Sequence, residues 1–156
     1  MEGKVFLIGF VMIAVIIGSL VAKEADIHSV SEFLEGWSEA LESGDLDRIM
    51  ECYDESEMTV VIVSDGIEFD GSAEIRELYE SLYERHDVTY VELENVVSRI
   101  SGDIAWVKCI FKAGMHQKSI DSSWELEVRT TLVLSNINGV WRIVQEHSSR
   151  IPVEHR

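Results

Sequence analysis

Residues 138–149, NGVWRIVQEHSS, combine a turn with the last strand-like segment of the chain. Side chains of a strand alternate between its two faces. One face of this segment therefore carries two large apolar residues followed by two polar ones: Trp141, Ile143, Gln145 and His147. This pattern is typical of a strand that leaves a hydrophobic core and enters a pocket, and histidine titrates near neutral pH. The pattern predicts a pocket but does not identify its ligand.

Before this segment, the chain divides into a helical block and a block of strands. Helical periodicity covers about 30–43, 45–52 and 71–83, and short strand-like segments lie at 58–63 and just before Gly71. The strand block then follows in four long segments, at residues 88–100, 104–115, 123–135 and 140–149. This order predicts a single α+β domain, with helices packed on one face of a curved antiparallel sheet.

The ends of the first predicted helix carry local sequence patterns. Ser29 and Glu32 form a capping-box pattern at its start. Gly44 follows its last apolar residues, where a glycine often ends a helix in a left-handed conformation.

Composition limits the classes of function. The chain has 156 residues and a formal net charge of −16, which disfavours nucleic acid because such binding depends on basic residues that contact phosphates. Cys52 and Cys109 lie far apart without a C-x-x-C pairing, so we expect free thiols buried in the fold, with a disulfide between them as the open alternative. The histidines show no metal-ligand spacing. We therefore predict no metal, no other cofactor and no nucleic-acid partner.

The N-terminus contains an uninterrupted apolar stretch, VFLIGFVMIAVIIGSLV, at residues 5–21. Its length falls between the apolar region of a signal peptide and a full membrane span. The residues after it fit a small-x-small cleavage site poorly, so a cleaved signal peptide and a retained membrane anchor both stay open, and a buried core helix is the remaining alternative. We expect residues 1–25 to direct export and contact the membrane, and residues 26–156 to form the domain.

Several short motifs occur in an order known from one superfamily. They are FLEGWSEA at 33–40, SGDLD at 43–47, FDG at 69–71, RTTLVL at 129–134, GVWRIV at 139–144 and EHSS at 146–149. In order and spacing, the chain resembles the nuclear transport factor 2-like superfamily, and within it the SnoaL-like proteins. The resemblance implies a cone-shaped, cystatin-like roll whose three N-terminal helices and curved antiparallel sheet enclose a pocket. Members include isomerases, dehydratases, hydrolases and non-enzymatic binding modules, so the resemblance does not select a reaction.

Two residues are candidate acid/base catalysts. His147 lies on the predicted pocket face of the last strand, where an imidazole acts as an acid, a base or a hydrogen-bond donor. For Asp54, between the second helix and the first strand, the resemblance implies a base in the pocket, as in some enzymes of the superfamily. A structural histidine and a solvated loop aspartate are the open alternatives.

Six residues are candidate ligand contacts: Trp37, Tyr53, Tyr79, Trp106, Arg129 and Gln145. The aromatic residues of the predicted helices also have the spacing that core packing demands, so a purely structural role stays open. The resemblance implies an Arg129 that faces the pocket and binds a carboxylate or phosphate. The alternation of residues 123–135 instead places Arg129 on the outer face of the sheet, as a surface ion pair with Glu127.

Three hypotheses for the function follow. The leading one is an exported SnoaL-like domain that binds a small, partly apolar molecule in a central pocket. The second is an enzyme that performs acid/base chemistry on such a molecule, with His147 or Asp54 as base. The third is an interaction module. The resemblance implies a homodimer through the outer face of the sheet, as in many members of the superfamily.

Overall fold

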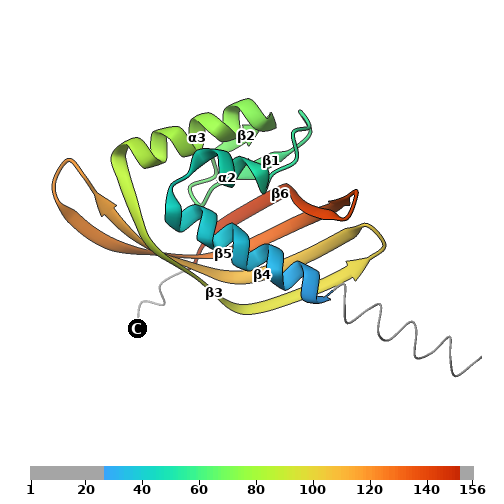
Figure 1. Ribbon diagram of the computed structural model, residues 1–156. Coiled ribbons are helices and arrows are strands. Elements are labelled where there is room, and N and C mark those ends of the chain that lie inside the picture. Colours follow the sequence, from blue (N-terminus) through green and yellow to red (C-terminus); the bar gives the residue numbers. More distant parts are fainter. Residues whose placement is uncertain (1–26, 152–156) are drawn as a thin grey trace, which may run out of the picture.

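The computed structural model describes residues 27–151, in which helices pack on one face of a curved sheet (Figure 1). Residues 27–43 are helical. The other elements are, in chain order, α2 Leu46–Glu51, β1 Val60–Ile62, β2 Glu68–Asp70, α3 Gly71–Arg85, β3 His86–Ser101, β4 Ile104–Gln117, β5 Ser122–Ile137 and β6 Val140–Arg150. Each element expected from sequence periodicity is present, with its ends shifted by a few residues. The predicted α+β roll is confirmed.

The six strands form one sheet in the order β2-β1-β6-β5-β4-β3. Strands β3 to β6 follow one another as antiparallel neighbours. Strand β1 pairs antiparallel with β2 but parallel with β6, so the sheet is mixed rather than purely antiparallel. A parallel pair needs a long connection, which α3 and the strands β3 to β5 provide here. The result places the end of β6 in the middle of the sheet, beside β1 and β5.

The hydrophobic core lies between the helices and the inner face of the sheet. Apolar residues of segment 27–43 recur at helical spacing and are buried there: Val30, Leu34, Trp37, Ala40 and Leu41. They meet Ile75 from α3 and Leu132 and Ile143 from the sheet, all of which are fully buried. Each such side chain contributes about 1.5–3 kcal/mol of burial free energy. This contact fixes the helices over the sheet.

The helix ends agree with the sequence patterns in part. Gly44 adopts φ +64° after the first helix, as the predicted end requires. The predicted capping box is wrong, because residues 27–30 are already helical and the Ser29 hydroxyl accepts a hydrogen bond from the Trp141 indole at 2.9 Å. Asp45 caps α2 instead, where its carboxylate accepts hydrogen bonds from the backbone N–H groups of Asp47 and Arg48.

The apolar stretch at residues 5–21 and the predicted boundary after residue 25 lie outside the described residues. Among residues 27–151, no helix has the length and hydrophobicity needed to cross a membrane.

Candidate ligand-binding cavity

A cavity of about 330 Å³ lies between the helices and the inner face of the sheet. Most of its wall is apolar, and the aromatic members come from helices and strands alike: Trp37, Tyr79, Tyr83, Phe111 and Trp124. Asp65, in the turn between β1 and β2, and Trp124 on β5 are exposed lining residues, so they mark the side that opens to solvent. A volume above about 300 Å³ with a mostly apolar wall is typical of small-molecule sites.

A β-bulge in β6 decides which of its polar side chains faces this cavity. Val133 of β5 pairs with Gln145, whereas the next residue, Leu134, pairs with Ile143, so Val144 is an extra residue in β6. Such an insertion reverses the alternation beyond it. Glu146 and Ser148 therefore line the cavity. The sequence-based prediction that Gln145 and His147 share the inner face of Ile143 is wrong.

The carboxyl group of Glu146 accepts a hydrogen bond from Tyr53, which is in turn bonded to Tyr79 on α3. The Tyr53 hydroxyl donates a hydrogen bond to Glu146 Oε2 at 2.6 Å. The Tyr53 and Tyr79 hydroxyl oxygens are 2.5 Å apart. Because the single proton of Tyr53 goes to the ionised carboxylate, Tyr79 donates to Tyr53 in that state. A chain of hydrogen bonds thus runs from α3 through Tyr53 to β6.

Burial perturbs the acidity of all three groups. Removal from water raises the pKa of Glu146 from 4.5 to about 7, and the hydrogen bond from Tyr53 opposes part of that rise. Burial, reinforced by the negative charge of Glu146, raises the pKa of Tyr53 and of Tyr79 well above 10. Both hydroxyls therefore stay protonated near neutral pH, while Glu146 exchanges its proton there. A group with this property serves as a hydrogen-bond donor, an acid or a base.

Three of the six predicted ligand contacts belong to this site. Trp37 and Tyr79 line the cavity, and Tyr53 reaches it through its hydrogen bond to Glu146. The indole N–H of Trp37 is buried and has no hydrogen-bond partner among the described residues.

The other three predicted contacts lie outside the cavity. Arg129 is exposed on β5 between buried Val128 and Thr130, as the alternation of that strand indicated, and no ion pair joins it to Glu127 within the described residues. Trp106 and Gln145 are likewise exposed. Any ligand contact of these residues would occur on the outer face of the sheet.

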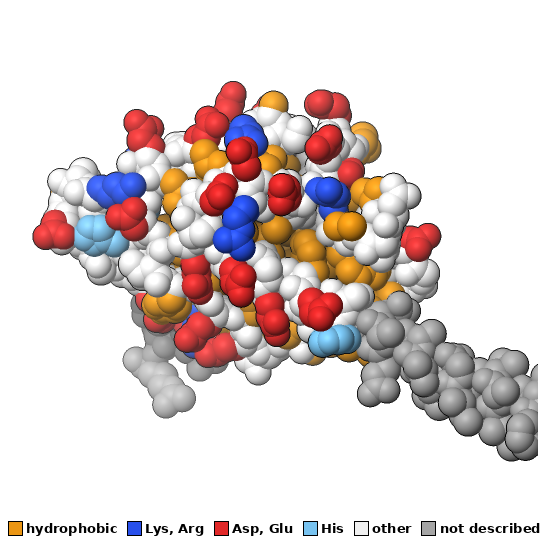
Figure 2. Space-filling view, viewed as in Figure 1, with side chains coloured by type: hydrophobic (Ala, Val, Ile, Leu, Met, Phe, Trp, Pro, Cys, Tyr) orange, Lys and Arg blue, Asp and Glu red, His pale blue; other side chains and the backbone are white. Residues whose placement is uncertain are grey.

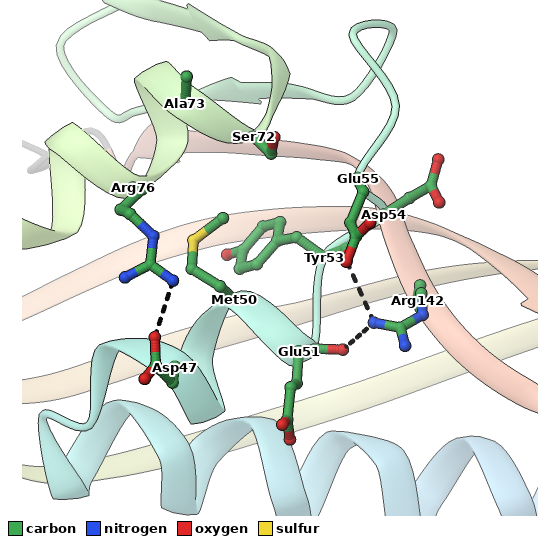
Figure 3. A pocket seen from close by; sticks show the side chains of 10 residues that line it. All are labelled: Asp47, Met50, Glu51, Tyr53, Asp54, Glu55, Ser72, Ala73, Arg76 and Arg142. Atoms are coloured by element: carbon green, nitrogen blue, oxygen red, sulfur yellow. Dashed lines mark hydrogen bonds and ion pairs between the residues drawn. The ribbon is translucent and has the colours of Figure 1, made fainter.

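The two predicted catalytic residues do not meet. His147 is exposed on β6, where it pairs with Ile62 of β1. Asp54 lines a separate outer cleft of about 560 Å³ at the start of α3 (Figure 3). No hydrogen bond or ion pair between Asp54 and His147 is found in residues 27–151. The carboxyl group that lines the cavity beside the tyrosine pair is that of Glu146, which the sequence analysis did not select.

The two arginines of the outer cleft already have hydrogen-bond partners in the protein. Arg76 contacts Asp47 at 2.8 Å, and Arg142 donates to the backbone oxygens of Glu51 and Tyr53 at 2.5 and 3.4 Å (Figure 3). Both arginines are therefore occupied by the protein itself. Of the two, only Arg76 has a carboxylate partner within residues 27–151.

The family model described as SnoaL-like domain matches residues 30–154. The chain therefore belongs to the SnoaL-like domain family. No curated protein matches the chain.

Several solved structures share this fold. A nuclear transport factor 2-like superfamily protein from Salmonella enterica has a TM-score of 0.71 at 17% identity, with 83% of this chain and 95% of that chain covered. A ketosteroid isomerase-like protein from Erwinia carotovora has a TM-score of 0.68 at 19% identity, with 81% of this chain and 96% of that chain covered. A protein of unknown function from Mycobacterium tuberculosis has a TM-score of 0.74 at 13% identity, with 86% of this chain and 77% of that chain covered. At these identities the likeness concerns the fold alone.

Proposed function

We propose that this domain binds one small, mostly apolar molecule in the cavity beside Glu146. The observation that supports the proposal is a cavity of about 330 Å³ whose mostly apolar wall contains the half-buried carboxyl group of Glu146. An apolar wall stabilises a ligand through burial, and a small number of polar groups fixes its orientation. The side chain of Glu146 has this second role.

A cavity-filling substitution tests the proposal. Ala113 is buried on β4 and lines the cavity, so Ala113→Phe places a ring where the ligand would lie. Native mass spectrometry of the purified protein should detect a retained small molecule that is lost from Ala113→Phe and kept by Trp106→Ala, a control on the outer face. Equal retention by both variants would show that the molecule binds elsewhere.

Acid/base catalysis on the bound molecule is the second candidate function. It is favoured by the position of Glu146, whose pKa of about 7 allows proton exchange at neutral pH in contact with the cavity. Turnover of a bound compound that disappears in Glu146→Gln, with binding retained, would support this function.

We also propose that the apolar stretch at residues 5–21 directs export, on the grounds of its composition. Expression of the full chain and of residues 26–156, followed by cell fractionation, tests this. Equal partition of the two forms would contradict it.

A homodimer through the outer face of the sheet is a further proposal. Trp106, Ile104 and Val97 are exposed apolar residues at neighbouring positions of β3 and β4. Analytical ultracentrifugation should give a dimer that Trp106→Glu converts to a monomer. A monomeric parent protein would contradict the proposal.

A further inference from the structure

The charges in the cavity wall constrain the ligand, provided that the proposed binding function holds. The carboxyl groups of the wall are those of Glu146 and Asp65, and the imidazole of His86 also lines it. Among the described residues, the wall contains no lysine and no arginine. A carboxylate or phosphate ligand would therefore lose its hydration without gaining a cationic partner, which is costly.

Glu146 itself has an unused hydrogen-bonding oxygen. Its Oε2 accepts the hydrogen bond from Tyr53, whereas its Oε1 has no donor among residues 27–151. Glu146 lines the cavity, so a donor that reaches Oε1 can come from a ligand. A buried carboxylate is stabilised when a cation that also donates a hydrogen bond pairs with it.

Two further features favour a positive ligand. Aromatic faces attract organic cations, and five aromatic side chains contribute to the wall. The chain has a formal net charge of −16, and Figure 2 shows Asp and Glu side chains spread over the face that carries the helices. The resulting potential attracts cations to the protein and repels anions.

We propose that the cavity binds an organic amine, with its apolar body against the aromatic wall and its ammonium group donating to Glu146 Oε1. At about 30 Å³ for each water-sized group, the cavity holds a body of roughly ten non-hydrogen atoms. The inference rests on the proposed binding function and specifies the class of ligand.

The pH dependence of amine binding follows from the groups around Glu146. Alkyl ammonium groups, with a pKa of about 10, stay charged below pH 8. Burial raises the pKa of Tyr53, Tyr79 and Tyr83 above 10 and that of the Cys109 thiol to about 11, so these neighbours stay neutral. Glu146 ionises as the pH passes about 7, and its pairing with the amine then begins. Amine affinity should therefore rise between pH 5 and pH 8, and controls are needed for the two other groups of the wall, His86 and Asp65.

Three probes with one skeleton test the inference: 3-phenylpropylamine, 3-phenyl-1-propanol and 3-phenylpropanoate. Binding at pH 8 is followed by isothermal titration calorimetry and by the fluorescence of Trp37 and Trp124, which line the cavity. We expect the amine to bind at least about tenfold more tightly than the alcohol, and the carboxylate not to bind. Equal or tighter binding of the alcohol or the carboxylate would overturn the inference and leave the proposed function intact. Absence of binding by all three at millimolar concentration would count against both.

Two variants identify the group that recognises the amine. Glu146→Gln should weaken binding of 3-phenylpropylamine at least about tenfold at pH 8 and remove the rise in its affinity between pH 5 and pH 8. Glu127→Gln, an exposed substitution that changes the net charge equally, should leave the amine affinity and its pH dependence unchanged. A pH dependence that persists in Glu146→Gln but vanishes in His86→Gln or Asp65→Asn would overturn the assignment to Glu146. The alcohol serves as the folding control, since its binding should change little in Glu146→Gln.

Discussion

Tyr53 lines the outer cleft and donates a hydrogen bond to Glu146 of the inner cavity, and the charged groups of these two regions have different partners. In the cleft, Arg76 has a carboxylate partner and Arg142 has two backbone oxygens. In the cavity, Glu146 has only a neutral hydroxyl as donor and no cation among the described residues. A charge at an exposed surface is easily satisfied by the protein and water, whereas the carboxyl of Glu146 is not. The cavity is therefore where we place the chemistry.

The largest expected difference between the two regions is in stability against pH. The pKa of Glu146 is about 7 in the folded protein and near 4.5 in the unfolded chain, so the folded state binds the proton more tightly. Its contribution to stability is complete below pH 4.5 and is lost as the pH rises through 7. Glu146→Gln should therefore raise the free energy of unfolding at pH 8 by up to about 3 kcal/mol, with little change at pH 4. Urea unfolding at both pH values measures this.

The matched control for that substitution is Asp54→Asn in the outer cleft. Because Asp54 is partly exposed, we expect this substitution to change the free energy of unfolding by less than about 0.5 kcal/mol at either pH. A similar gain in the free energy of unfolding from both substitutions at pH 8 would mean that net charge, rather than burial of Glu146, sets the pH dependence of stability.

A smaller effect is expected from the hydrogen bonds of the cavity. Tyr53→Phe removes the donor to Glu146 and leaves the Tyr79 hydroxyl without its partner. We expect the free energy of unfolding at pH 8 to fall by about 2 kcal/mol. The pKa of Glu146 should rise further, because the hydrogen bond from Tyr53 lowers that pKa. Tyr79→Phe keeps the donor to Glu146 and should shift the pKa less. Equal shifts in the two variants would contradict the hydrogen-bond order described above.

The smallest effect should come from the ion pair of the cleft. Arg76 and Asp47 are both well exposed, so solvent screens their attraction. A double-mutant cycle with Arg76→Ala and Asp47→Ala should give a coupling of less than about 1 kcal/mol, which falls further at high salt. A larger coupling that resists salt would show that the cleft is as well shielded as the cavity.

The fold was predictable because its patterns are local. The apolar spacing of residues 30–41 follows the helix period, and the alternation of residues 123–135 correctly put Arg129 on the outer face. Boundaries such as Gly44 rest on a residue that tolerates positive φ. These features depend on a few neighbouring residues, so the sequence displays them.

The site was predictable only in part, because it depends on distant contacts. One local feature was present: Ile143 and Val144 are consecutive apolar residues, which interrupts the alternation and is consistent with a bulge. The bulge exchanges the inward positions of His147 and Glu146. The partner of Glu146 is Tyr53, 93 residues earlier, and no periodicity relates the two positions. Cavity residues Trp37 and Tyr79 were found because helix periodicity identified their inward faces.

The protonation of Glu146 can be followed by carbon-13 NMR of protein labelled at its glutamate carboxyl groups, with Glu146→Gln used to assign the resonance. We predict that this carboxyl titrates with a pKa of about 7 and that its resonance responds to 3-phenylpropylamine. A pKa near 4.5, with no response to the amine, would contradict both the inward position of Glu146 and its role in binding the ligand.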